Sequence, residues 1–143
     1  MPSLEGVYEI KMSTTFASID EAIRELRDKI SKSKTVWINS IPLSLLAKIA
    51  PFLKNKDVRI ILPLGEKPTD ELKLLGDVSV TKFRVYKDYK GIDANMGEIY
   101  FADKVYNVAY TKDRILEIDT IEYERCIKCM RDMFESAWKS ARK

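Results

Sequence analysis

The chain has 143 residues, of which 45% are apolar and 33% are charged, and this balance predicts one folded domain with its own hydrophobic core. Its 25 basic and 22 acidic residues leave a net charge of +3. This charge is too small for a strong overall electrostatic field that would attract nucleic acid, a membrane or an acidic substrate. No apolar run approaches the roughly 18 residues of a membrane span, and residues 1–6 lack the features of a secretory signal. With only two cysteines, the chain is expected to be intracellular and cytoplasmic.

Histidine is absent from the sequence. Because histidine is the commonest general acid or base and the commonest metal ligand, its absence removes many kinds of site. Ser-His-Asp and Cys-His catalysis, zinc sites with histidine and transfer through a phosphohistidine are excluded within one chain. We therefore expect no catalytic residue, no cofactor and no bound metal.

The N-terminal half alternates between strands and amphipathic helices. A first strand is expected over residues 7–12, and a capping box at residues 18–21 begins a helix that ends at residues 32–34. Residues 35–39 and 58–62 predict two buried strands, joined by a helix that follows Pro42 and that Pro51 shortens. This spacing is typical of a right-handed βαβ unit with a parallel sheet.

The C-terminal half adds further strands and one long helix. Thr69 caps a short helix that Gly76 ends, residues 78–86 predict a bulged strand, and residues 87–97 a polar loop. Residues 98–102 and 105–111 predict a hairpin turning at residues 103–104, residues 114–118 an edge strand, and a second capping box at 119–122 a helix to about residue 142. The expected fold class is α/β, with a mixed, mostly parallel sheet flanked by helices, in a single domain over residues 1–143.

Three stretches resemble one half of a phospholipase-D-like domain: residues 22–62, the hairpin GEIYFADKVYNVAY and the ending MFESAWKSARK. Active members of that family carry H-x-K-x-x-x-x-D at this hairpin, where the His attacks phosphorus and the Lys neutralises phosphate charge. When Asp103 takes the Asp position, Met96 takes the His position and Glu98 the Lys position. A thioether cannot form a phosphohistidine-like intermediate, and a carboxylate repels phosphate. The resemblance thus implies the fold without the enzymatic activity.

The catalytically silent relatives are the nearer comparison, because the chain is similar to the effector domain of TrmB-type archaeal transcription regulators. That family binds sugars and begins with a winged helix that binds DNA. Only a few residues precede the first expected strand here, so we expect no winged helix. The similarity implies a non-enzymatic regulatory domain that senses a sugar-like ligand or assembles with a DNA-binding regulator. The absence of histidine and the Lys- and Ile-rich composition favour a prokaryotic, archaeal source. Because active relatives pair two halves, a homodimer is expected.

Oxygen-bearing side chains gather in the sequence around the hairpin, at Asp93, Asn95, Glu98 and Asp103. They are candidates to bind a ligand hydroxyl or a hard cation. Turn formation is the simpler explanation for residues 93–95 and 103–104. A second alternative function, a metal-dependent phosphodiesterase, would use Asp93, Glu98 and Asp103.

One basic and aromatic cluster is the candidate nucleic-acid site of the first alternative function, a nucleic-acid-binding accessory protein. Lys and Arg side chains would contact phosphates while Tyr rings stack on bases. Alternating Lys and Arg on a strand also occur as a solvated edge. The cluster comprises Lys82, Arg84, Tyr86, Lys87, Tyr89 and Lys90.

The two cysteines lie three positions apart within the last predicted helix. A thioredoxin-like motif needs its first Cys at a helix N-terminus, and a zinc site needs four ligands. Cys126 and Cys129 are therefore expected to be core or half-buried thiols, with a metal shared across a dimer as the alternative.

Overall fold

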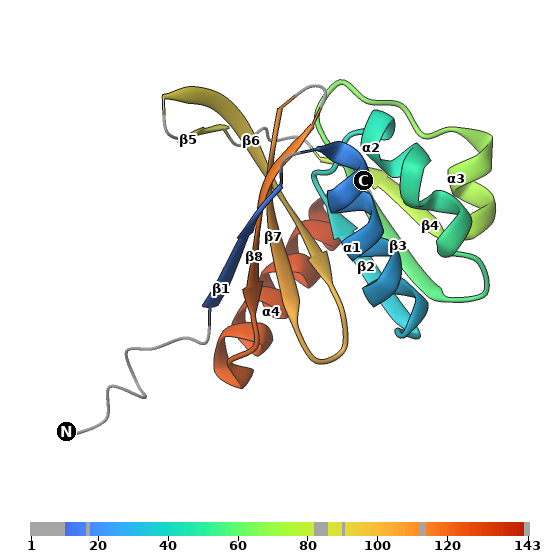
Figure 1. Ribbon diagram of the computed structural model, residues 1–143. Helices are drawn as coiled ribbons and strands as arrows, with labels where there is room; N and C mark the ends of the chain where they lie inside the picture. Colours follow the sequence, from blue (N-terminus) through green and yellow to red (C-terminus); the bar gives the residue numbers. More distant parts are fainter. Residues whose placement is uncertain (1–10, 17, 82–85, 90, 112–113, 142–143) are drawn as a thin grey trace.

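The computed structural model describes residues 11–16, 18–81, 86–89, 91–111 and 114–141 (Figure 1). Its centre is an eight-stranded sheet. Seven of the strands follow the order β1-β8-β7-β6-β2-β3-β4, and the eighth, β5, pairs with β6. The strands are β1 (Lys11–Thr15), β2 (Thr35–Asn39), β3 (Asp57–Leu62), β4 (Asp77–Val80), β5 (Tyr86–Tyr89), β6 (Ile92–Tyr100), β7 (Val105–Tyr110) and β8 (Ile115–Ile121). The helices are α1 (Ile19–Ser31), α2 (Leu43–Ile49), a 3₁₀ turn (Ala50–Phe52), α3 (Asp70–Leu75) and α4 (Glu124–Ala141).

Helices cover both faces of this sheet, as Figure 1 shows. The larger core lies on the face of α1 and α2, where Leu26, Leu46 and Phe101 are buried together. A smaller, aromatic core lies on the other face, where Phe134 of α4 stacks on Trp37 of β2 with 5.2 Å between ring centroids. The long helix α4 is therefore held by aromatic contacts with the middle of the sheet.

The N-terminal elements follow the sequence prediction closely. Ser18 accepts a 3.2 Å hydrogen bond from the Glu21 amide and begins α1, and Thr69 caps α3 in the same way. Pro51 lies in the 3₁₀ turn that ends α2, so the helix is short as expected. Strands β2 and β3 are parallel neighbours in the sheet, and α2 lies in the connection between them, which confirms the βαβ unit.

The prediction of a mostly parallel sheet was wrong. Only the β2–β3 and β3–β4 ladders of the described sheet are parallel, whereas β1–β8, β8–β7, β7–β6, β6–β5 and β6–β2 are antiparallel. The reason is the connectivity of the C-terminal half, where short turns join successive strands and force antiparallel pairing. The fold is a mixed α/β sheet dominated by a meander.

Several boundaries in that meander also differ from the prediction. The first strand, expected over residues 7–12, is described from Lys11 to Thr15, and residues 7–10 lie outside the described part. The single strand expected over 78–86 is instead β4, which ends at Val80, and β5, which begins at Tyr86. The polar loop expected over 87–97 is mostly β-structure, because polar and apolar residues alternate at the start of β6 and this segment pairs with β5.

The last strand and the start of the last helix were misplaced as well. Strand β8 is not an edge strand, because it lies between β7 and β1. The expected capping box at residues 119–122 belongs largely to β8, which continues to Ile121, and α4 begins at Glu124. Pairing of Ile121 with Val105 and Lys11 holds these residues in the sheet against their local preference for a helix start.

Among the described helices, none combines the length and the apolar character that crossing a bilayer requires.

Candidate functional site

A row of polar side chains crosses the sheet on the face that carries α4. Asn39 of β2 pairs with Glu98 of β6, Glu98 pairs with Asn107 of β7, and Asn107 pairs with Asp119 of β8. Directly paired residues share one face of a sheet, so the four side chains stand side by side. We call Asn39, Glu98, Asn107 and Asp119 the polar row.

The polar row lies directly beside the aromatic core. Each of its members is two residues along its strand from a member of the next row, Trp37, Tyr100, Val105 and Ile121, which packs under α4. All four polar side chains are half-buried. With strands about 4.8 Å apart, the row spans about 14 Å, which is the length of a small ligand.

The Glu98 carboxyl of the polar row accepts hydrogen bonds from two neighbouring side chains. The Asn39 side-chain amide donates a 3.1 Å hydrogen bond to its Oε1, and the Tyr100 hydroxyl donates a longer one of 3.5 Å. Burial raises the pKa of Glu98 from its usual value, and these two hydrogen bonds only partly oppose that effect. Burial and the nearby Glu98 carboxylate in turn raise the pKa of Tyr100, so its hydroxyl stays a proton donor.

The backbone after β2 holds Asn39 in place. Ser40 has a φ of 59°, its amide donates to the Ile61 carbonyl at 2.8 Å, and its hydroxyl donates to Asn39 Oδ1 at 3.3 Å. The Tyr110 hydroxyl donates to the Ser40 carbonyl at 2.5 Å. Gly97 lets this segment approach β6, because a Cβ there would lie 2.7 Å from the Ser40 oxygen. The Asn39 end of the row is thus rigidly supported.

The four oxygen-bearing residues predicted as a group are spread along the chain. Asp93 and Asn95 occupy odd positions of β6 and Glu98 an even one, so they belong to opposite faces of the sheet. Asp103 lies in the turn beyond the strand, and ten residues at about 3.3 Å each separate it from Asp93. The structure therefore places only Glu98 in the polar row.

Asn95 and Asp103 have surroundings of their own. The Oδ1 atom of Asn95 is buried without a hydrogen-bond partner among the described residues. Asp103 accepts a 3.0 Å hydrogen bond from Lys29 of α1. Slight burial acts to raise the pKa of Asp103, but the hydrogen bond and charge of Lys29 outweigh it, and the pKa is lowered. Asp103 joins the turn to α1.

The basic and aromatic cluster lies largely beyond the described residues. Lys82, Arg84 and Lys90 fall outside them, whereas the backbone of Tyr86, Lys87 and Tyr89 forms β5. Strand β5 pairs with β6 at the end away from α4 (Figure 1). The nucleic-acid role of this cluster stays a prediction.

The acidic residues and thiols of the described part do not assemble into a metal centre. No group of three or more Cys, Asp or Glu side chains in it is placed to hold a metal ion. Cys126 is half-buried beside the aromatic core, and Cys129 is exposed on α4. The metal-dependent alternative would need Asp93, Glu98 and Asp103 together, and they lie apart.

Three members of the polar row were missed in the sequence. Asn39 ends a strand that was predicted correctly, but Asn107 and Asp119 were assigned to a hairpin interior and to a helix cap. A polar residue at a core-facing position of successive strands is the signal that could have found them. The turn at residues 103–104 was predicted, but the pairing of β6 with β2 and of β7 with β8, which completes the row, was not.

Solved structures with a similar arrangement come from proteins of different kinds. TrmBL2, an archaeal chromatin protein whose structure shows a novel mode of DNA binding, is 10% identical with a TM-score of 0.59, over 95% of this chain and 55% of its own. NucT from Helicobacter pylori is 12% identical with a TM-score of 0.63, over 91% of this chain and 96% of its own. Polyphosphate kinase from Porphyromonas gingivalis is 10% identical with a TM-score of 0.53, over 96% of this chain and 27% of its own.

The chain shares its fold with these proteins. It spans about half the length of TrmBL2 and about a quarter of the polyphosphate kinase, but nearly all of NucT. At 10–12% identity, the likeness is one of fold alone. No protein-family model matches the sequence, and no curated protein matches it either.

Proposed function

We propose that the chain is a non-catalytic, phospholipase-D-like domain that senses a small, hydroxyl-rich ligand at the polar row. The observation that carries this proposal is the position of Glu98, a half-buried carboxyl that is hydrogen-bonded to Asn39 where the resemblance places the phosphate-binding Lys. The fold likeness to TrmBL2 and NucT supports the phospholipase-D-like part of the proposal.

The charge of the row argues against phosphate as its ligand. Glu98 and Asp119 lie two strands apart on the same face, and Met96, at the family's His position, packs beside Ala94 and Ala109. Two carboxylates without a lysine or arginine in the row repel an anion. A phosphodiester would therefore meet neither a nucleophile nor a counter-charge there.

The same side chains suit a neutral polyol. Carboxylates accept hydrogen bonds and amides both donate and accept, so two of each can bind several hydroxyl groups at once. Half-burial strengthens such bonds, because water competes less for them. A sugar-like ligand fits this set of groups and the span of the row.

A thermal-shift screen of neutral sugars against the matching sugar phosphates tests the proposal. A neutral sugar should raise the melting temperature, and its phosphate should not. Glu98→Gln and Asn107→Ala should each lower the affinity about tenfold, as the loss of buried polar contacts does. Asp93→Asn is the matched control, since Asp93 is exposed on the opposite face.

An assay with a chromogenic phosphodiester tests the non-catalytic part separately. Pure protein is expected to release no product with or without divalent metal ions. Turnover that disappears in Asp103→Ala would instead favour the metal-dependent phosphodiesterase and overturn the proposal.

The proposed sensor works as a homodimer and passes its signal to a DNA-binding regulator. Pairing would follow the two-fold arrangement that the resemblance implies. Light scattering after size-exclusion chromatography should give twice the mass of 16.5 kDa. A strict monomer at tens of micromolar would contradict the dimer and leave the sugar test unaffected.

Nucleic-acid binding is the second candidate function, and the likeness to the DNA-binding TrmBL2 favours it. It predicts binding of single strands that weakens steeply with salt. Lys82→Glu with Arg84→Glu should abolish it, whereas Glu98→Gln should not. If the variant with Lys82→Glu and Arg84→Glu binds single strands as well as the wild type does, this cluster is excluded as the contact surface.

A further inference from the structure

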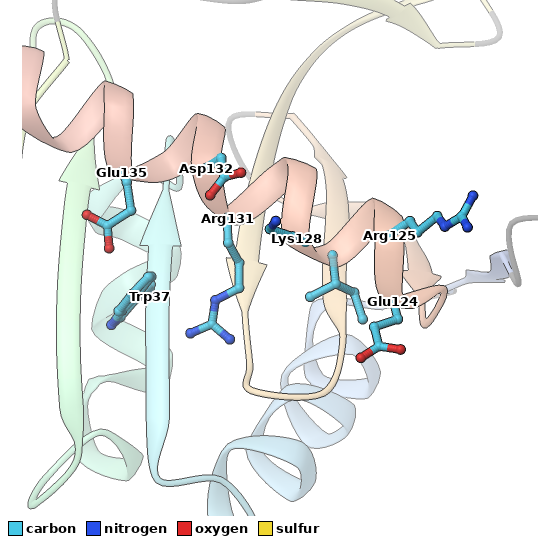
Figure 2. Close-up of a pocket in the computed structure, with 8 residues that line it drawn as sticks. Trp37, Glu124, Arg125, Lys128, Arg131, Asp132 and Glu135 are labelled. Atoms are coloured by element: carbon cyan, nitrogen blue, oxygen red, sulfur yellow. The ribbon is translucent and has the colours of Figure 1, made fainter.

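A groove of about 600 Å³ runs along α4, separate from the polar row. Trp37 of β2 forms one wall, and the side chains of α4 form the other (Figure 2). Arg131 reaches from α4 to the Ala102 carbonyl at 3.5 Å, beyond the end of β6, whereas Glu98 lies on the other side of Tyr100 along that strand. Helix α4 thus divides the sheet face into two sites.

Trp37 and Arg131 form the built centre of this groove. The Arg131 guanidinium lies over the Trp37 ring, 4.8 Å from the ring centroid. The ring covers one face of the guanidinium and leaves most of the guanidinium N–H groups for other partners. Both side chains are at least partly buried, and Trp37 is only 8% exposed. The indole fixes the guanidinium in one orientation, which suits it to bind a carboxylate.

An ion pair closes one end of the groove. Arg59 of β3 donates a 3.0 Å hydrogen bond to Glu135, and its guanidinium lies 4.6 Å from the centre of the Trp37 ring. Glu135 is thereby neutralised. Among the charged side chains of α4 that line the groove, which also include Arg125, Lys128 and Asp132, Arg131 is the one that lies over the Trp37 ring.

A carboxylate lies at the opposite end. Figure 2 shows Glu124 and Arg131 on the same side of α4, toward Trp37. They are seven residues apart, so their Cα atoms are about 10 Å apart along the helix axis. The buried Ile127 lies on the helix between them. A ligand here would meet the Arg131 guanidinium, the apolar surface of Ile127 and the Glu124 carboxylate in sequence, and Lys128 also lines this stretch.

We propose that the groove binds a short zwitterionic peptide of two or three residues. Its carboxylate would pair with Arg131, its ammonium with Glu124, and an apolar side chain would pack on Ile127 and Trp37. An extended tripeptide is about 10 Å long, which matches the spacing of the two charges. The volume also falls within the range of about 300–1,000 Å³ for small-ligand sites.

The test uses the full chain and four forms of one probe: free Ala-Leu-Ala, its N-acetylated form, its C-amidated form and the doubly blocked form. Isothermal titration or NMR titration should show saturable binding of the free peptide at about 1 mM or tighter. Each block should weaken binding about tenfold, because each removes one charge-assisted contact.

Variants assign each end of the peptide. In Glu124→Gln the acetylated and free forms should bind alike, and in Arg131→Gln the amidated and free forms should bind alike. Exposed Lys139→Gln, near the far end of α4, is the matched control and should leave all four affinities unchanged. The comparison of the four probes on the wild-type chain needs no variant, so that part of the test does not depend on a variant folding well.

Three outcomes would overturn the peptide site. One is the absence of saturable binding of the free peptide. Another is equal binding of all four forms, which indicates nonspecific apolar contact. The third is sensitivity to amidation but not to acetylation, which indicates a simple anion site at Arg131. Sugar binding at the polar row is measured independently, so its result is not affected.

Discussion

The Asn39 side chain of β2 donates a 3.1 Å hydrogen bond to Glu98 of β6, and this bond joins the parallel part of the sheet to the antiparallel meander. The two residues are 59 positions apart in the sequence. Because β6 lies next to β2, a carboxyl from the hairpin is placed beside an amide from the βαβ unit. The candidate ligand site exists only where these two halves of the fold meet.

The raised pKa of Glu98 predicts a pH-dependent loss of stability. The folded chain holds this proton more tightly than the unfolded chain, so the contribution is fully present below about pH 4 and is lost as the pH rises through the raised folded pKa. Glu98→Gln keeps a neutral side chain and should be more stable than the wild type at pH 8. Urea unfolding between pH 4 and pH 8, followed by tryptophan fluorescence, should show the gain shrinking toward acid. A Met133→Ala control, at an exposed position of α4 that carries no titratable group, should show no such trend.

Gly97 is predicted to be intolerant of any side chain. A Cβ there would lie 2.5 Å from Ile41 Cδ1 and 2.8 Å from the Asn39 carbonyl oxygen, and backbone atoms cannot move aside cheaply. Gly97→Ala should therefore reduce the free energy of unfolding by about 3 kcal/mol. Gly91→Ala is the comparison, because its φ is +78° but nothing lies near its Cβ, and it should cost only about 1 kcal/mol. Equal losses in the two variants would contradict the close approach at Gly97.

Phe134 is predicted to be the main anchor of α4. Its ring stacks on Trp37 at 5.2 Å and on Trp138 at 6.1 Å, and it is 1% exposed. Phe134→Ala should cost about 3–5 kcal/mol, as the removal of a buried aromatic ring does. Its neighbour Met133 is 66% exposed, so Met133→Ala should change stability by less than about 0.5 kcal/mol. Thermal or urea unfolding of both variants checks this difference.

The ion pair between Arg59 and Glu135 is predicted to contribute more than the surface pair between Lys32 and Asp28. Arg59 is partly buried and contacts the rings of Trp37 and Trp138, whereas Lys32 and Asp28 are about 70% exposed. Arg59→Met should cost about 1–2 kcal/mol. Lys32→Met should cost less than about 0.5 kcal/mol. A double-mutant cycle with Glu135→Gln should give a coupling energy that is clearly above that of the surface pair.

The elements of the N-terminal half were predictable because each carries its own local signals. Ser18 and Thr69 cap helices by contacts within three residues, and the apolar runs of β2 and β3 are buried on both faces. In the C-terminal half, polar residues in β6 were assigned to a loop. They tolerate an extended conformation because β5 and β7 supply hydrogen bonds on both sides.

The sequence by itself determined the α/β class, the helix caps, the βαβ unit and the absence of histidine chemistry, because these depend on residue type and short spacings. Only the tertiary structure decided that the sheet is mostly antiparallel and that Glu98 stands between Asn39 and Asn107 in a row that ends at Asp119. It also placed Arg131 over Trp37, with α4 lying across the sheet face. Such neighbours depend on strand register and helix docking, which many weak contacts across the whole chain set together.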